Sequence, residues 1–294
     1  MINNNYDSEK LTLQRRAIQK ISLLPSIPAT LQKIILTSND PHSSAEDMQK
    51  IIEKDQSISA AILKLANSAY FGYTRQIHEI KQAIIIIGFN TAVSVAVSVS
   101  VLKSLADKFD SPEFSRDDFW KHTIATGEAA RIVAHTIGFE PSAKAYITGL
   151  LHDVGKIVLL LVDSKEFNDA VFESHAMNKP LNICEMQAFG FDHQSAGGWL
   201  GNRWKLPDSI VSGLLYHHDL DSCPEEFLQE ATITHLANYV CIKAHIGNSG
   251  DIADQKLHEN VKIVLKINNK MIDQILGELE KKKDEIDAFF EILL

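Results

Sequence analysis

Five of the twelve histidines in this 294-residue chain are placed so that they could bind metal together with nearby acidic residues. The pair His152-Asp153 comes directly after the largely apolar segment 145–151. A buried imidazole or carboxylate needs a partner, and a metal ion is one such partner. The alternative is a helix that ends in a histidine, which the helix dipole favours. The local sequence leaves these two interpretations equally open.

The other four candidate histidines lie on either side of this pair. His122 is on a predicted helix one turn after Asp118, a spacing that can hold one cation from two points. Alone, this spacing favours a capping aspartate next to an ordinary histidine. His193 comes at the start of a predicted helix, and His217 and His218 end another. Adjacent side chains on a helix diverge by about 100°, so both rings reach one site only where the helix ends.

Two residues outside this set could also serve the chemistry. Lys156 follows Gly155, which is predicted to break a helix, and a cation beside a metal site suits an anionic substrate such as phosphate. Asn238 shares a helical face with His235, where an amide is most often structural. The remaining histidines lie in polar or irregular surroundings and show no metal spacing; they are His42, His78, His135, His175, His245 and His258.

Composition narrows the classes of protein to which the chain can belong. It carries 29 Lys and Arg against 38 Asp and Glu, a formal charge of −9, which disfavours binding to nucleic acid or to an anionic membrane. Its three cysteines, Cys184, Cys223 and Cys241, are odd in number and have no CxxC spacing, so no disulfide framework is predicted. Residues 1–20 contain no apolar core of a signal peptide. We therefore expect a cytoplasmic protein.

One long uncharged stretch, residues 82–102, could span a bilayer by its length. Its polar residues favour a buried core element instead; they are Gly88, Asn90, Thr91, Ser94, Ser98 and Ser100. The alternation of valine with alanine or serine over 93–101 slightly favours a strand. A helix packed on all sides is the other interpretation, and the helical patterns on either side support it.

Elsewhere, apolar residues recur with the period of a helix. The clearest case is one face formed by Ile58, Ala61, Ile62, Leu65, Ala66 and Ala69. Capping spacings at Ser44 and Ser115 predict two helix starts. Further helices are predicted within 143–161, 207–215, 231–246 and 270–294. The loosely patterned segment 107–117 is the predicted boundary between two helical halves.

The run His152-Asp153-Val154-Gly155-Lys156 resembles the His-Asp doublet of the HD superfamily of metal-dependent phosphohydrolases. The order of this doublet and the other histidines along the chain is similar to the order in the HD-GYP branch. Enzymes of that branch hydrolyse cyclic dinucleotides at a site of two or three metals. The resemblance implies the metal ligands His122, His152, Asp153, His193, His217 and His218, with Asp118 as an additional acidic ligand. It also implies catalytic roles for Asp153 and Lys156, the latter as a phosphate contact.

Two departures from that pattern concern activity. The last ligand of the family is an Asp after an Ala, but here Ala237 is followed by Asn238. The Gly-Tyr-Pro signature is replaced after His218 by Asp219-Leu220-Asp221. An amide can still ligate a metal through its oxygen, so Asn238 stays in the candidate metal set, but it contributes no charge and accepts no proton.

The first half of the chain makes the resemblance more specific. Leu24-Pro25-Ser26-Ile27-Pro28, the segment from Leu65 to Gly72, and Gln82-Ala83-Ile84 leading to Ile87-Gly88 resemble the HDOD (HD-related output) domain. The resemblance covers residues 14–245 and implies an all-α fold in which 83–105 is helical. We expect an N-terminal helical bundle (14–110) packed on a C-terminal HD-like helical domain (115–245), with a helical extension at 255–294.

The resemblance implies a bacterial signalling protein that acts mainly as an output or interaction domain. Its expected partners are a signalling protein or a small phosphorylated ligand, and an oligomer is compatible with it. An active phosphohydrolase of cyclic dinucleotides or nucleotides, and a metal-free scaffold with a histidine-lined pocket, remain alternatives. Histidines mixed with carboxylates suit one to three divalent ions of iron, zinc, manganese or nickel better than magnesium.

Overall fold

The computed structural model describes residues 27–38, 42–68, 76–105, 114–251 and 256–293, and in addition residues 15, 17–19, 22 and 40. Within these ranges every regular element is a helix, so the predicted all-α fold is confirmed. Residues 24–26, residues 69–72 and most of the predicted boundary at 107–117 lie outside the described residues.

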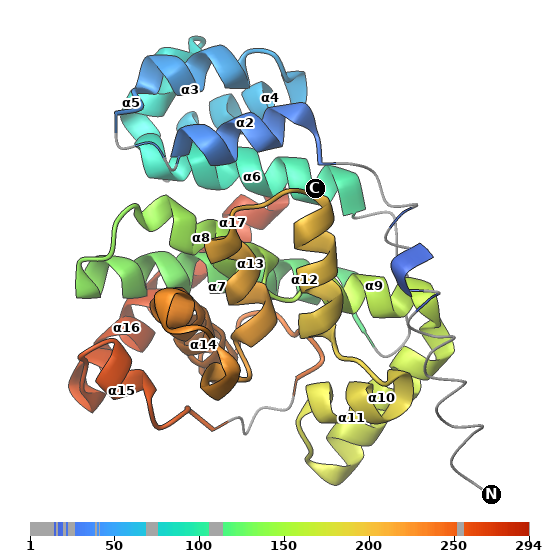
Figure 1. The fold of residues 1–294 in the computed structure, drawn as a ribbon. Coiled ribbons are helices and arrows are strands. Elements are labelled where there is room, and N and C mark those ends of the chain that lie inside the picture. The colour runs from blue at the N-terminus through green and yellow to red at the C-terminus, as the bar shows by residue number, and fades with distance from the viewer. Residues whose placement is uncertain are drawn as a thin grey trace, which may run out of the picture.

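Four short helices form the N-terminal bundle (Figure 1): α2 (Ala29–Ser38), α3 (Ala45–Ile52), α4 (Gln56–Ala66) and α5 (Ile80–Ile87). Ser44 and Asp47 cap the start of α3 reciprocally, as their spacing predicts. The carboxylate of Asp55 caps α4 by accepting from the backbone N–H of Ser57 at 2.9 Å. The predicted apolar face of α4 is buried from Ile58 to Ala66.

Helix α6 (Phe89–Leu105) lies between this bundle and the rest of the molecule (Figure 1). The valine alternation that favours a strand is misleading, because α6 is buried around almost its whole circumference and needs no polar face. Its serines are compatible with burial since Ser94 and Ser100 each donate to a carbonyl four residues earlier. Ser98 instead bonds to the hydroxyl of Tyr146 at 2.9 Å.

The HD-like half is built on the long helix α7 (Arg116–Ile137), which starts at the predicted cap Ser115 and ends at Gly138 in the left-handed conformation. The helices that follow are α8 (Ser142–Leu151), α9 (Val154–Val162), α10 (Ser164–Met177), α11 (Leu181–Phe189), α12 (His193–Arg203), α13 (Asp208–Tyr216) and α14 (Leu228–Lys243). Two 3₁₀ turns, η3 (Leu220–Ser222) and η4 (Glu225–Phe227), connect α13 to α14. Helices α8 and α14 both pack on α7.

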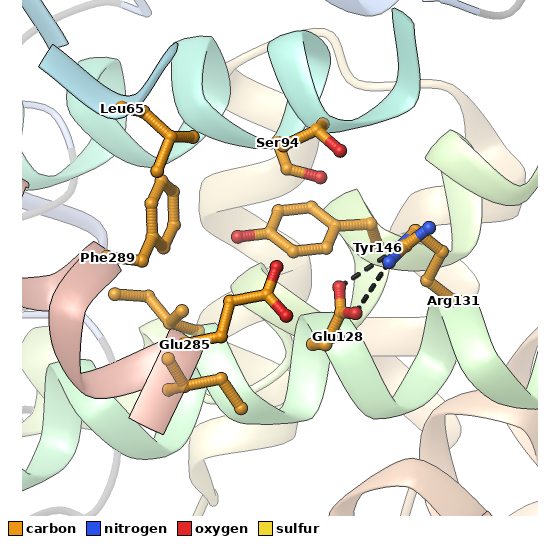
Figure 2. Close-up of a pocket in the computed structure, with 10 residues that line it drawn as sticks. Leu65, Ser94, Glu128, Arg131, Tyr146, Glu285 and Phe289 are labelled. Atoms are coloured by element: carbon orange, nitrogen blue, oxygen red, sulfur yellow. Dashed lines mark hydrogen bonds and ion pairs between the residues drawn. The ribbon is translucent and has the colours of Figure 1, made fainter. Parts of the chain in front are cut away.

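The C-terminal helices are α15 (Val261–Val264), α16 (Asn269–Lys281) and α17 (Lys283–Leu293). Helix α16 packs on α7 and α14, and α17 contacts α4, α6 and α7, so it touches both halves. Figure 2 shows Phe289 of α17 beside Leu65 of α4. Lys282, at the junction of α16 and α17, ion-pairs with Glu128 of α7 at 3.0 Å.

Among the described residues, one stretch is long and apolar enough in composition to cross a membrane, and a second qualifies only if two helices bent against each other count as one span. The first is Ser142–Val162, and 94% of its most apolar 18-residue stretch is buried inside the protein. The second is the pair α5 and α6, which is bent by 112° at Gly88. The burial of α6 confirms the expectation that 82–102 contributes a core element.

We expect Leu65→Ala to lower the free energy of unfolding by about 2–5 kcal/mol, because Leu65 is 5% exposed and truncation leaves a cavity between α4 and α17. Leu36→Ala is the matched control, since Leu36 is 60% exposed on α2. Chemical denaturation measures both variants. Equal midpoints for wild type and Leu65→Ala would show that this face of α4 is not part of the core.

A second prediction concerns Glu128, whose carboxylate accepts from Arg131 at 2.6 Å and from Lys282. Burial raises its pKa, but the two cations outweigh burial and lower the pKa below its usual range. A depressed folded-state pKa means that the stabilisation is present above the unfolded pKa of about 4.3 and is lost as the pH falls further. We expect Glu128→Gln to cost about 1.5–3 kcal/mol at pH 7.

Denaturation of wild type and Glu128→Gln between pH 7 and pH 3 measures this dependence. The difference between the two proteins should be constant down to about pH 5 and shrink below about pH 4. A difference that does not change with pH would mean that packing, and not the ion pairs, accounts for the effect.

Candidate metal centre

The His-Asp pair lies at a break between two helices. Helix α8 ends at Leu151, and α9 begins at Val154, so His152 and Asp153 form the turn between them. The prediction that Gly155 breaks the helix is therefore wrong, since Gly155 lies inside α9. A Cβ atom at Gly155 would collide with the backbone carbonyl of His193. The glycine is needed for the close approach of α9 to the start of α12.

Among the described residues, two groups of side chains bring their ligand atoms within 4.8 Å of one another. One group is His122, His152 and Asp153, and the other is Asp153, His193, His217 and His218. The Oδ2 atom of Asp153 is 3.2 Å from His152 Nε2, and its Oδ1 atom is 3.3 Å from His193 Nε2. Asp153 therefore belongs to both groups and would be a ligand in either of them.

Hydrogen bonds on the far side of the rings fix which nitrogen faces the centre. Nδ1 of His152 lies 2.7 Å from the carbonyl of Gly149, and Nδ1 of His217 lies 3.0 Å from the carbonyl of Leu214. A carbonyl only accepts, so Nδ1 carries the proton and Nε2 presents a lone pair to the centre. This arrangement is typical of histidines that bind metal.

Three buried atoms of these two groups have no hydrogen-bond partner among the described residues: His152 Nε2, Asp153 Oδ1 and His218 Nε2. Asn238 Oδ1, on α14, is a fourth buried atom without a partner among those residues. Each such atom costs about 1–3 kcal/mol when it is left unpaired. With a neutral ring protonated at Nδ1, His152 Nε2 and Asp153 Oδ2 are two acceptors 3.2 Å apart, and either a metal ion or a proton on Nε2 removes their repulsion. A metal ion would provide a partner for such buried polar atoms, so the residues present fit a metal ion.

Burial keeps three of the histidines neutral. It lowers the pKa of His122 and of His217 to about 4, and it lowers the pKa of His218 well below its usual range. Burial raises the pKa of Asp153, but the neighbouring His152 and Lys156 outweigh it and lower that pKa well below the usual range. Neutral imidazoles and an ionised carboxylate are the forms that bind a divalent cation.

The sequence analysis missed Glu185, a fully buried residue of α11. Its Oε2 atom accepts from the backbone N–H of His193 at 2.9 Å and lies 2.6 Å from Nδ1 of the same residue. Burial lowers the pKa of His193, but the Glu185 carboxylate outweighs it and raises that pKa to about 8. Glu185 thus orients His193 as a carboxylate orients a metal-bound histidine. No sequence signal marks this role, because it arises from the packing of α11 against the start of α12.

The remaining candidates occupy different positions. Asn238 of α14 is 1% exposed, and its unpaired Oδ1 is one of the four atoms described above. Asp118 is exposed in the first turn of α7 and belongs to neither group, so its role as a ligand stays a prediction. His235 has partners on both ring nitrogens, the carbonyl of His217 and the backbone N–H of His258, and is therefore structural.

Lys156 is fully buried, and its Nζ atom donates to Asp153 Oδ2 at 2.7 Å, to Asp251 Oδ2 at 2.8 Å and to the carbonyl of Ser249 at 3.0 Å. These three acceptors account for its three protons. Its role as a phosphate contact stays a prediction, and it would require one of these bonds to break.

A cavity of about 150 Å³ borders the centre beside His122. Residues 245–251 form much of its wall, through His245, Gly247, Asn248, Ser249 and Asp251. It gives a polar ligand a place next to the first group of candidate metal ligands.

A sequence profile of the HDOD domain matches residues 24–220, more than half of the chain. The chain belongs to the HDOD domain family. The profile covers the site from His122 to His218 but ends before Asn238 and Asp251. The matched region contains the five histidines and Asp153, whereas α14 and the segment after it lie outside that region.

Comparison with known proteins agrees with this assignment. An HDOD domain protein with unknown function from Geobacter sulfurreducens is 25% identical, with a TM-score of 0.78 over 97% of this chain and 98% of that chain. A "Putative signal transduction protein" from Marinobacter aquaeolei VT8 is 20% identical, with a TM-score of 0.81 over 100% of this chain and 67% of that chain.

An uncharacterized protein from Treponema pallidum (strain Nichols) is 26% identical over 220 residues. These residues are 74% of this chain and 42% of that protein, so the chain spans less than half the length of this relative.

We expect Gly155→Ala to destabilise the protein, because the new methyl group would force α9 away from the His193 carbonyl. Gly277→Ala on α16 is the control, since a Cβ atom there meets nothing within 4 Å. Alanine is the better helix former, so the control should gain about 0.5–1 kcal/mol. Thermal unfolding compares the two variants. Equal stability of both would contradict the close approach of α9 and α12.

Proposed function

We propose that this HDOD protein is a cytoplasmic bacterial signalling module that holds divalent transition metal at the His-Asp centre. It acts by binding a partner protein or a small phosphorylated ligand and not mainly by turnover. The observation that carries the proposal is the set of three unpaired buried atoms in the two groups, His152 Nε2, Asp153 Oδ1 and His218 Nε2, which a cation would satisfy. The cavity beside His122 is the place where a phosphorylated ligand would reach the centre.

Elemental analysis of protein purified without added metal or chelator tests the proposal. We expect iron, zinc, manganese or nickel, because neutral imidazole and carboxylate ligands suit these ions. Metal that binds the folded state raises the thermal midpoint, so a chelator should lower it. His217→Ala should lose metal. His42→Ala should keep it, because His42 is exposed and distant in the sequence from the candidate ligands. Wild-type protein that binds none of these ions after loading would refute the metal site.

A second candidate function is phosphodiester hydrolysis, and the retained ligand set favours it: His122, His152, Asp153, His193, His217 and His218. A divalent cation bound here would supply Lewis-acid polarisation of a phosphoryl oxygen. The chain would contribute His152 and Asp153 as fixed ligands. Asn238 counts against efficient turnover, because an amide neither accepts a proton nor adds negative charge.

We expect weak or absent wild-type turnover, and we expect Asn238→Asp to raise both metal affinity and any basal phosphodiesterase activity. Removing a charged or acid–base group from an active site commonly lowers the rate by about 10²–10⁴-fold. Introducing a carboxylate at position 238 should therefore raise the rate. Metal-loaded proteins are assayed on cyclic di-GMP and on a generic phosphodiester.

His152→Ala serves as the blank in this assay. If wild type turns over substrate robustly and His152→Ala abolishes this activity, the protein is an enzyme and the proposal of a binding module is wrong. Metal bound in wild type and in Asn238→Asp, with no activity in either, supports a centre that binds ligand or stabilises the fold.

A further inference from the structure

The segment that follows α14 is fastened to the helix that carries His122. The backbone N–H of Asn248 donates to the carbonyl of Asp118 at 3.0 Å. Gly247 has a φ of +65°, and a Cβ atom there would collide with the backbone of Asp118 and His122. A bond between His175 Nε2 and the carbonyl of Gly250, 2.9 Å long, ties the same turn to α10. Residues 247–251, the covering turn, are therefore bound to α7 and to α10, and they line the cavity beside His122.

The covering turn places one carboxylate inside the protein. The side chain of Asp251 is 2% exposed, and its Oδ2 atom accepts from Lys156 Nζ at 2.8 Å and from the hydroxyl of Ser249 at 2.8 Å. Lys156 also donates to Asp153 Oδ2 at 2.7 Å. One buried ammonium group thus joins the carboxylate of the covering turn to the carboxylate of the metal centre.

This chain of contacts has a geometric effect on Asp153. Because Lys156 holds Oδ2, the other oxygen, Oδ1, faces His193 Nε2 at 3.3 Å and His217 Nε2 at 3.7 Å. Oδ1 is the atom without a hydrogen-bond partner among the described residues. The carboxylate is therefore fixed with its free oxygen directed at the second group of ligands.

Charge leads to the same conclusion. Lys156 paired with Asp153 alone would cancel the negative charge that attracts a cation to the centre. Asp251 supplies a second negative charge to Lys156, so the three side chains carry a net charge of −1. With two carboxylates and the carbonyl of Ser249 as acceptors, the buried ammonium group has all three of its protons paired.

We propose that Asp251 is a positioning residue of the metal centre, which acts through Lys156 to fix Asp153 and to preserve its charge for the metal. This inference rests on the proposed function, because it assumes that the centre binds metal. It assigns a role in the site to a residue beyond the part of the chain that the HDOD profile matches.

The test compares wild type with Asp251→Asn, which keeps the shape of the side chain and removes its charge. Glu230→Gln is the matched control, since it breaks a half-buried ion pair with Lys144 (2.7 Å) away from the centre. Mn²⁺ binding is measured by titration calorimetry, and thermal midpoints are recorded with and without Mn²⁺. We expect Asp251→Asn to bind Mn²⁺ about 10–100-fold more weakly, as loss of a residue that orients a ligand does.

A purely structural role for Asp251 would give a different result. Asp251→Asn would then lower the metal-free midpoint as Glu230→Gln does, and both variants would keep the wild-type shift on Mn²⁺ loading. That result would overturn the proposal. If Asp251→Asn does not fold, Ser249→Ala removes one hydrogen bond to Asp251 and should weaken Mn²⁺ binding by a smaller factor.

A second outcome concerns anions. If Asp251→Asn binds inorganic phosphate more tightly than wild type and its Mn²⁺ affinity is unchanged, the proposal is overturned. Asp251 would then compete with phosphate for Lys156.

A crystal structure of metal-free Asp251→Asn separates this proposal from the proposed function. We expect Asp153 Oδ1 to leave its position near His193 Nε2. If Asp153 stays, the positioning role is wrong whatever the metal content. If wild type binds no metal but Asp153 moves in the variant, the positioning role of Asp251 holds and the metal site of the proposed function fails.

Discussion

The structure depends on one buried negative charge, the carboxylate of Asp153, which has no exposed surface in an otherwise largely apolar helical core. An isolated charge at such a depth is too costly to persist, so it must be paired. Lys156 pairs with one oxygen, and the other oxygen faces the imidazoles of His193 and His217. The polar groups gathered at the centre of the HD-like half follow from this requirement.

Bringing these partners together constrains where helices end and how closely they approach. His152 and Asp153 reach the centre because α8 stops at Leu151, and His217 and His218 reach it because α13 stops at Tyr216. Their ring centroids are 4.3 Å apart, which adjacent residues inside a helix could not achieve while both face one point. Gly155 then allows α12 to approach α9 so that His193 lies opposite Asp153.

The sequence predicts features that depend on local pattern. These include the buried face of α4, the caps at Ser44 and Ser115, and the order of the histidines, which carries the family resemblance. It mispredicts Gly155, because a glycine that breaks a helix and one that permits close packing look alike until the neighbouring helix is known. Glu185 and Asp251 were missed for a related reason: an acidic residue among many becomes a buried partner only through tertiary contacts that no spacing encodes.

The balance of charge at the centre bears on whether it turns over substrate or holds ligand. Asp153, Asp251 and Glu185 are fully or almost fully buried carboxylates; Lys156 offsets one of them, and His193, whose pKa is raised to about 8 by Glu185, offsets another. Asn238 presents an unpaired oxygen of the right kind to ligate a metal but adds no charge. A centre with this composition favours cation binding through its geometry while lacking the proton acceptor that an aspartate would provide at that position. For that reason a centre that binds and responds to a ligand accounts for these residues better than an efficient hydrolase.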